Sequence, residues 1–173
     1  LAETKGADIV MATDPDADRV GIAVRDNEGK MILLNGNQTA SLLTYYILTK
    51  WNEAGRLGEN TYCVKTIVTT ELLTAIANKF GIQMYDVLTG FKYIAEIVRN
   101  NEGKRVFVCG GEESYGFNIG EFVRDKDAVN ASMLICEMAA YYRTQGISLL
   151  QARENLYKKY GVYYHTLHCF TFE

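Results

Sequence analysis

Three aspartates at every second position, with an arginine directly after the last, form the part of this sequence best suited to chemistry. The aspartates are Asp14, Asp16 and Asp18, Arg19 follows them, and an apolar run over residues 9–12 precedes them. Carboxylates this close raise one another's pKa unless a cation neutralises them. Oxygen ligands favour Mg²⁺, Mn²⁺ or Ca²⁺, and a guanidinium fork suits phosphate. The loop therefore predicts a divalent metal site with phosphoryl chemistry beside it.

Three other interpretations of this acidic loop can be set against a metal site of that kind. Counted from Asp14, an EF-hand needs glycine at the sixth position and glutamate at the twelfth, but Arg19 and Arg25 stand there, which excludes it. A phosphatase with an aspartate nucleophile stays open, because Asp14 and Asp16 have Asp-x-Asp spacing after a strand. It leaves Asp18 and Arg19 without a role. A solvated acidic loop without a ligand also stays open.

A second polar loop follows a later strand and combines glycines with hydrogen-bonding side chains. Residues 110–116 read Gly-Gly-Glu-Glu-Ser-Tyr-Gly, so Glu112 and Ser114 stand between glycines. Glycines let a backbone approach a ligand closely, and short polar side chains can bind sugar hydroxyls. A simple tight turn explains this loop equally well. Downstream, Asp127 suits a helix cap, whereas Lys126 could offer a point charge to phosphate.

Composition and charge narrow the class of protein. The chain has 173 residues, of which 48% are hydrophobic, enough for a sizeable buried core. The formal net charge of -3 and the lack of a long basic block argue against a nucleic-acid partner. No apolar run approaches the roughly 18 residues that would span a membrane. The cysteines lack paired spacing, which favours a cytoplasmic protein with reduced thiols. The sequence begins with Leu1, so we expect a piece of a longer chain.

Apolar runs bounded by turn residues alternate with helical patterns along the sequence. This alternation predicts an α/β fold, a layered mixed sheet with helices on both faces. Loops 88–90 and 110–116 follow strands, where such folds usually bind ligands. Lys65 lies beside a strand end; a position that reaches the cleft stays open, but we expect its side chain to be solvated. We expect strands at residues 9–12, 20–24, 31–34, 63–68, 83–87, 105–109 and 162–170. We expect helices at 37–54, with Asn37 as its cap, and at 71–80, 91–100, 128–142 and 149–160.

Four motifs of the sequence together resemble the α-D-phosphohexomutases, the family that includes phosphoglucomutase and phosphomannomutase. The metal loop of that family reads Asp-Gly-Asp-x-Asp-Arg, and residues 14–19 depart from it only at Pro15. Its sugar loop in glucose-specific members, Gly-Glu-Glu-Ser-Phe-Gly, is similar to residues 111–116. Its Thr-Gly-Trp-Lys loop is similar to residues 89–92, and its Arg-Glu-Lys-Asp-Gly segment to residues 124–128.

The resemblance implies a role for each candidate residue. The three aspartates would hold Mg²⁺, and Arg19 would contact the substrate phosphate. Glu112 and Ser114 would bind sugar hydroxyls, Thr89 would touch the ligand, and Lys126 would supply the lysine that contacts substrate.

The resemblance also implies that the sequence is the middle of a four-domain enzyme. Residues 1–29 would be a strand-loop-hairpin remnant of the second domain with the metal loop, residues 30–145 the third domain with the sugar loop, and residues 146–173 a linker helix and strand toward the fourth. The family's phosphoserine loop, Thr-Ala-Ser-His-Asn-Pro, has no counterpart, because residues 39–41 continue into a helical pattern. The phosphate loop of the fourth domain, Arg-x-Ser-Gly-Thr, is also absent. We therefore expect no catalytic residue within this sequence.

By the same resemblance, the parent enzyme would interconvert hexose 1-phosphate and hexose 6-phosphate through a phosphoserine and a bisphosphate intermediate. Its partners would be glucose 1-phosphate, glucose 6-phosphate, glucose 1,6-bisphosphate and the domains of the parent chain that this sequence lacks. A phosphopentomutase-type member and the aspartate-nucleophile phosphatase remain alternatives. We expect this chain alone to bind Mg²⁺ and sugar phosphate without catalysing a reaction.

Overall fold

The N-terminal part of the chain forms a three-stranded antiparallel sheet with the order β1-β2-β3. The structure is a computed structural model that describes residues 1–166, 168, 170 and 171. Along β2 the residues Val20, Ile22 and Val24 are buried, and those between them are partly exposed, as the period of two in a strand requires. The predicted hairpin is confirmed. The elements are α1 (Ala2–Lys5), β1 (Ile9–Thr13), β2 (Val20–Arg25) and β3 (Met31–Leu34).

A second, mixed sheet has the strand order β5-β4-β6-β7. Strand β4 is parallel to β5 and β6, and β7 is antiparallel to β6. A mixed sheet of this kind with helices around it confirms the predicted α/β class. The strands are β4 (Thr61–Thr66), β5 (Gln83–Val87), β6 (Val106–Gly111) and β7 (Phe117–Ile119). The helices are α2 (Gly36–Glu53), α3 (Leu72–Lys79), α4 (Phe91–Asn101), α5 (Ala128–Thr144) and α6 (Leu149–Tyr160).

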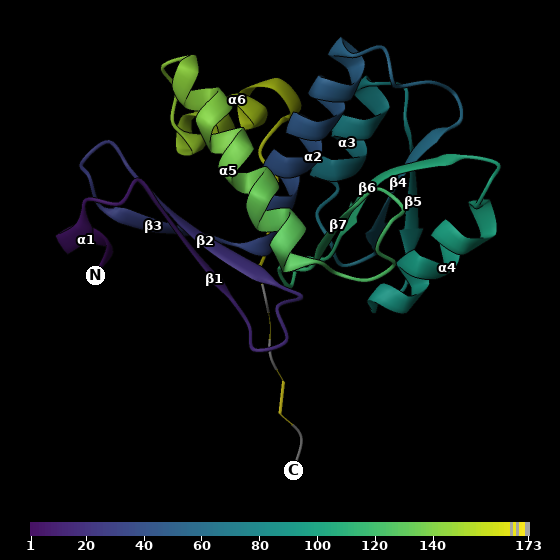
Figure 1. Ribbon diagram of the computed structural model, residues 1–173, viewed down its shortest axis with the longest axis horizontal. Helices are drawn as coiled ribbons and strands as arrows, with labels where there is room; N and C mark the ends of the chain where they lie inside the picture. Colours follow the sequence, from purple (N-terminus) through teal and green to yellow (C-terminus); the bar gives the residue numbers. More distant parts are fainter. Residues whose placement is uncertain (167, 169, 172–173) are drawn as a thin grey trace.

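Helices cover both faces of the mixed sheet (Figure 1). On one face, α4 buries Phe91, Ile94 and Val98 against Tyr62 and Phe107, and the spacing of three and four residues puts its apolar side chains on one stripe. On the other face, α2 and α3 pack with α5 and α6 in a larger core, which also includes the buried side of β2. This larger core therefore joins the two sheets into one body.

Helix α2 begins earlier than the pattern predicts. Its cap is Asn35 rather than Asn37, because the Asn35 side chain accepts a hydrogen bond from the Gln38 amide and the Gln38 side chain accepts one from the Asn35 amide. This reciprocal arrangement is a capping box. Asn37 instead accepts a hydrogen bond from the Thr70 amide at 3.0 Å, which joins α2 to the loop before α3.

The predicted strand over residues 162–170 is wrong for the part of it that the structure describes. Residues 161–166, 168 and 170 have no regular secondary structure, and residues 167 and 169 lie outside the described residues. After Gly161 the described residues 162–165 lie along the start of α2 and line a cavity there, so they lie against helices and loops and form no strand pairing. Figure 1 shows the chain descending from this region toward its C-terminus. An apolar pattern makes a strand only where a neighbouring strand completes its hydrogen bonds.

The predicted domain limits at residues 29 and 145 stay a prediction. Strand β3 extends the N-terminal sheet to residue 34, so this sheet crosses the first limit. In the part of the chain that the structure describes, no helix combines the length and the apolar character that a membrane crossing needs.

Candidate functional site

The three aspartates lie together in the turn between β1 and β2. One carboxylate oxygen from each of Asp14, Asp16 and Asp18 lies within 4.8 Å of the others. An octahedral Mg²⁺ with bonds of about 2.1 Å places opposite ligands about 4.2 Å apart, so these three oxygens need only a small adjustment to share one ion. The donor set is oxygen alone and carries three negative charges. It fits a hard divalent cation.

Backbone hydrogen bonds shape this turn. Asp14 Oδ1 accepts the amides of Asp18 and Arg19, both at 3.1 Å, which folds residues 14–19 back on themselves. Ala17 has a φ of 56°, in the left-handed region, and Pro15 fixes a second dihedral angle. The Arg19 amide, with help from Asp18, holds the pKa of the Asp14 carboxyl below its ordinary value. Asp14 is therefore ionised at neutral pH and ready to bind a cation.

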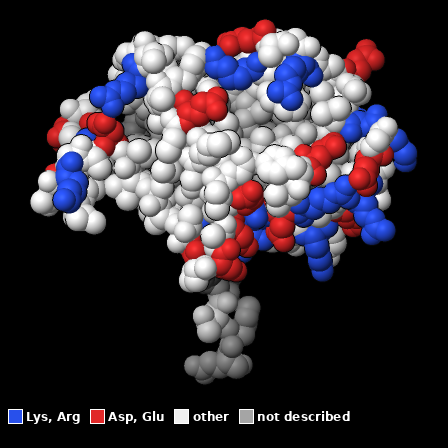
Figure 2. All heavy atoms as spheres, viewed as in Figure 1, with Lys and Arg blue, Asp and Glu red and all other residues white. Residues whose placement is uncertain are grey.

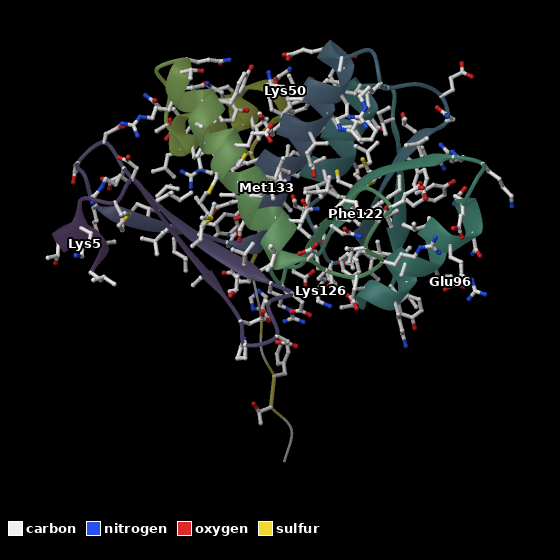
Figure 3. The ribbon with its side chains drawn as sticks, in the orientation of Figure 1. Lys5, Lys50, Glu96, Phe122, Lys126 and Met133 are labelled. Carbon is white, nitrogen blue, oxygen red and sulfur yellow. The ribbon has the colours of Figure 1, made fainter. Side chains whose placement is uncertain are left out.

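Lys126, labelled in Figure 3, forms an ion pair with Asp18 of the acidic turn. Its ammonium is 3.2 Å from Asp18 Oδ2 and 3.2 Å from Asp125 Oδ1, and only 12% of its side chain is exposed. Burial lowers the pKa of Lys126, but the hydrogen bonds to Asp125 and Asp18 raise it by more, so the net shift is upward. The lysine thus carries a full positive charge next to the acidic turn, where a phosphate could replace one of its carboxylate partners.

The glycine-rich loop meets the acidic turn through backbone contacts. The Val20 amide donates to the Tyr115 carbonyl at 3.3 Å, and Arg19 pairs with Gly116 as an isolated antiparallel bridge. The Ala128 amide, at the start of α5, donates to the Ala17 carbonyl at 3.2 Å. Residues 14–19 therefore form one site with residues 110–116 and 126–128, which lie far from them in the sequence. Figure 2 shows acidic and basic side chains meeting on the lower edge of the molecule, where this turn lies in Figure 1.

Glu112 is the buried member of the site. The residue is 4% exposed, and burial raises the pKa of its carboxyl, an effect that the nearby Lys126 charge partly offsets. Gly116 lets the two side chains come together, because a Cβ at this position would overlap the Lys126 stem and would lie 3.1 Å from Glu112 Oε2. The glycine is thus required by the close approach of these side chains.

Thr89 and Ser114 complete the set of residues that the sequence predicts. Thr89 is exposed in the loop before α4, and Ser114 is partly buried at the tip of the glycine-rich loop. The loop of Thr89 reaches the site through Phe91, whose ring centroid is 5.3 Å from the Lys126 ammonium. The structure therefore brings the predicted residues to one edge of the fold, formed by the β1–β2 turn and the carboxyl ends of β5 and β6.

Lys65 is a charged residue at this edge whose burial the sequence does not predict. The sequence predicts a solvated Lys65, but this lysine is fully buried and forms ion pairs with Glu71 and Asp86. The prediction is wrong because both partners come from other elements, the start of α3 and the strand β5. A lysine inside an otherwise apolar strand run is the available signal, since a lysine is rarely buried fully unless it is paired.

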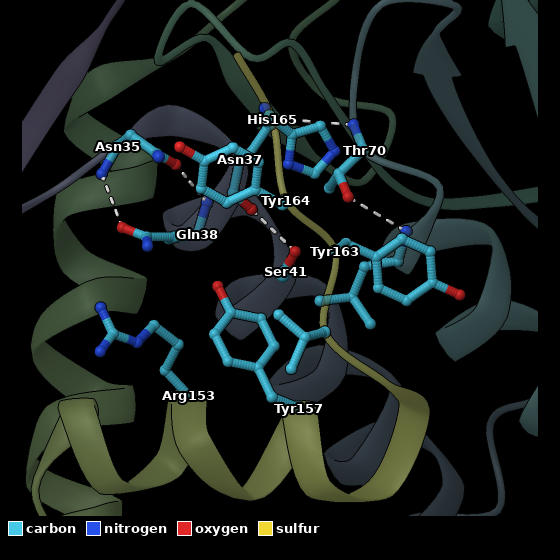
Figure 4. Close-up of a pocket in the computed structure, with 12 residues that line it drawn as sticks. Asn35, Asn37, Gln38, Ser41, Thr70, Arg153, Tyr157, Tyr163, Tyr164 and His165 are labelled. Carbon is cyan, nitrogen blue, oxygen red and sulfur yellow. Dashed lines mark hydrogen bonds between the residues drawn. The ribbon is translucent and has the colours of Figure 1, made fainter.

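A separate cavity of about 260 Å³ lies between the start of α2, α6 and residues 162–165 (Figure 4). Several of its polar groups bond one another, as Ser41 does with the Asn37 carbonyl at 2.7 Å. None of the predicted site residues is among those that line it. We therefore place the candidate site at the acidic turn and not in this cavity.

Comparisons with known proteins identify relatives of the chain. A family model described as phosphoglucomutase/phosphomannomutase, alpha/beta/alpha domain III, matches residues 35–160. The phosphoglucomutase of Staphylococcus aureus strain USA300 is 37% identical over 173 residues, which are 100% of this chain and 31% of that protein. The chain thus spans less than a third of the length of this curated relative.

Solved structures have the same fold. The crystal structure of a putative phosphomannomutase from Thermus thermophilus has a TM-score of 0.71 and 27% identity, over 89% of this chain and 31% of that one. The crystal structure of Aspergillus fumigatus N-acetylphosphoglucosamine mutase in complex with GlcNAc-6P and magnesium has a TM-score of 0.60 and 17% identity, over 88% of this chain and 35% of that one.

Proposed function

Because the chain belongs to the phosphoglucomutase/phosphomannomutase family, we propose that it provides one wall of the active site of a sugar-phosphate mutase. The whole protein would interconvert hexose 1-phosphate and hexose 6-phosphate through a phosphoserine and a bisphosphate intermediate. The observation that carries the proposal is the meeting of residues 14–19, 110–116 and 126–128 at one edge of the fold. That edge combines a cation site, phosphate-binding charges and groups that suit sugar hydroxyls.

Each side chain of the site has a task in this proposal. Asp14, Asp16 and Asp18 would hold Mg²⁺, which when bound would act as a Lewis acid and neutralise charge on the transferred phosphoryl group. Arg19 would donate hydrogen bonds to phosphate oxygens from its planar guanidinium, and Lys126 would add a positive charge on the other side of Asp18. Both would orient the phosphate for transfer, and most of the catalytic gain would come from such positioning.

The sugar would be held by the glycine-rich loop and its neighbour. Glu112 can accept hydrogen bonds from two adjacent sugar hydroxyls, and such bonds to an ionised carboxylate are strong in a buried place. Ser114 can donate or accept at the loop tip, and Thr89 can do so from the opposite loop. Alone, the chain would bind the ligand without transferring phosphate, because none of its residues corresponds to the phosphoserine loop.

The proposal is tested by Mg²⁺ binding to this chain and to an Asp16→Asn variant, measured by isothermal titration calorimetry. We expect the variant to bind Mg²⁺ at least about tenfold more weakly, because one of three charged ligands becomes neutral. Asp26→Asn, in the turn before β3, is the matched control and should leave the affinity unchanged. Equal Mg²⁺ affinity in the chain and the Asp16→Asn variant would contradict the assigned cation site.

A further inference from the structure

Lys65 is a fully buried lysine whose ammonium has three oxygen partners. It lies one residue before the end of β4, and its side chain is 0% exposed. Its Nζ is 2.6 Å from Asp86 Oδ1, 2.8 Å from Glu71 Oε1 and 3.3 Å from the Thr69 carbonyl. The contacts to Glu71 and Thr69 are hydrogen bonds, and the contact to Asp86 is an ion pair. A buried charge without such partners would be strongly destabilising.

The three acceptors of Lys65 fix the loop that follows β4. Asp86 belongs to the adjacent strand β5, Glu71 directly precedes α3, and Thr69 lies in the turn between β4 and α3. The Thr69 amide also donates to the Thr66 carbonyl at 3.0 Å, which closes the turn. The Lys65 ammonium therefore connects the carboxyl ends of β4 and β5 to the start of α3.

This turn contacts the glycine-rich loop through two buried threonines. The Thr66 and Thr69 hydroxyls are 2.6 Å apart, and each is 3.2 Å from Glu113 Oε2. Each hydroxyl has one proton, so when one threonine donates to the other, the second donates to the carboxylate. Glu113 is thereby held by the turn, and it stands between the two predicted sugar ligands, Glu112 and Ser114.

The start of α2 also contacts the glycine-rich loop, from a different side. A Cβ at Gly36 would overlap the Glu113 carbonyl, so the helix backbone lies directly against the loop at this residue. The Glu113 carbonyl and carboxylate are thus both in contact with the protein. Glu113 therefore anchors the loop, while its neighbour Glu112 lies beside Lys126.

We propose that Lys65 is a positioning residue for the sugar-binding loop, acting through Thr69, Thr66 and Glu113. The ammonium holds the turn between β4 and α3, and the threonines transmit that position to Glu113. Glu112 and Ser114 are then presented to the sugar in a fixed geometry. The inference deepens the proposed function and rests on it in one respect, namely that residues 110–116 bind sugar phosphate.

Two substitutions test this chain of contacts. In Lys65→Met the stem keeps its length and the charge is removed. Glu71 and Asp86 are 60% and 45% exposed at their side chains, so they regain water and leave no buried charge unpaired. Thr69→Val removes one hydroxyl and keeps the shape of the side chain, and Thr69→Ser restores the hydroxyl. Lys50→Met, which removes an ion-paired lysine from α2, is the matched control.

The first measurement is amide hydrogen exchange in residues 110–116, followed by NMR. We expect Lys65→Met and Thr69→Val to exchange at least about tenfold faster there, with little change at residues 14–19, while Thr69→Ser and Lys50→Met retain wild-type rates. The second is the affinity for glucose 1-phosphate, which should fall about tenfold in Lys65→Met and Thr69→Val and recover in Thr69→Ser.

The results separate this inference from a purely stabilising role and from the proposed function. Unchanged exchange and affinity in folded Lys65→Met and Thr69→Val would overturn the inference, even if both variants melt at lower temperature. If Lys65→Met does not fold, Thr69→Val and its serine rescue decide the question. If the unsubstituted chain fails to bind glucose 1-phosphate, sugar binding by this chain is refuted, and the exchange rates still decide whether Lys65 positions the loop.

Discussion

Glu112 shows at the scale of one residue how a binding site can be built at the expense of stability. The residue is 4% exposed, and the charge of its neighbour Lys126 only partly offsets the rise in the carboxyl pKa that burial causes. A ligand hydroxyl could add a hydrogen bond to this carboxylate. The unliganded fold therefore bears a cost that would be recovered when sugar binds, a pattern common at functional sites.

This cost predicts a pH-dependent effect of Glu112→Gln. The folded-state pKa of the carboxyl is raised above its ordinary 4.5, so ionisation costs the folded state more than the unfolded state. The penalty is absent in acid and appears as pH rises through 4.5 to the raised folded value. We expect Glu112→Gln to melt like the unsubstituted chain well below pH 4.5 and at a higher temperature at neutral pH, in thermal unfolding followed by circular dichroism.

Glu96→Gln on α4 is the control, because it removes the same charge from an exposed position (Figure 3). Its melting temperature should follow that of the unsubstituted chain across the same pH range. A lower melting temperature for Glu112→Gln at neutral pH would mean that the ionised carboxylate stabilises the fold, contrary to the burial argument.

Single residues also mark where sequence reasoning succeeds and fails. The proximity of Asp14, Asp16 and Asp18 is predictable because all three lie in one short turn, so their spacing already brings them together. The burial of Lys65 is not predictable, because its partners Glu71 and Asp86 reach it from other elements. Burial of a charge depends on what the fold brings to it, and local sequence does not contain that information.

At the scale of elements, the apolar runs predict the existence of strands more reliably than their ends. The run around β4 predicts residues 63–68, but β4 spans Thr61–Thr66, and Ile67 and Val68 are 54% and 51% exposed in the following turn. A strand ends where its partners end, and those partners are β5 and β6. The predicted limits of β5 and α6 agree with the structure because turn or cap residues stand at both ends.

Helix α2 gives a prediction at this scale, since its start lies against the glycine-rich loop. Replacing Asn35 with alanine removes the side-chain acceptor for the Gln38 amide. We expect Asn35→Ala to lower the free energy of unfolding by about 1 kcal/mol, measured by urea denaturation. Asn35→Asp keeps an acceptor next to the positive end of the helix and should stay within about 0.5 kcal/mol of the unsubstituted chain. Equal losses in both variants would show that the cap is not the source of the effect.

At the scale of the whole molecule, the fold brings distant segments to one edge. Arg19 pairs with Gly116, and Ala17 is joined to Ala128 over a still longer separation in sequence. The α/β class and the carboxyl-edge location of the site follow from alternation and from the position of loops after strands. The pairings themselves could not be predicted, because no local pattern specifies which loop a turn will meet.

The central claim is that the acidic turn and the glycine-rich loop form one site, in which a divalent cation and a sugar phosphate are bound side by side. Such ligands must influence each other's affinity, and by thermodynamic linkage the influence is reciprocal. Two ligands at separate sites without coupling would bind independently.

Calorimetric titration of the chain with glucose 1,6-bisphosphate, with and without saturating Mg²⁺, tests this claim most directly. We expect the chain to bind the bisphosphate weakly, and we expect Mg²⁺ to increase this affinity by about fivefold or more, within the usual range of coupling energies. In Asp16→Asn, Mg²⁺ should leave the affinity for the bisphosphate unchanged. An acyl phosphate trapped on Asp14 would overturn the mutase assignment in favour of a phosphatase with an aspartate nucleophile. Identical affinity with and without Mg²⁺ would contradict a shared site.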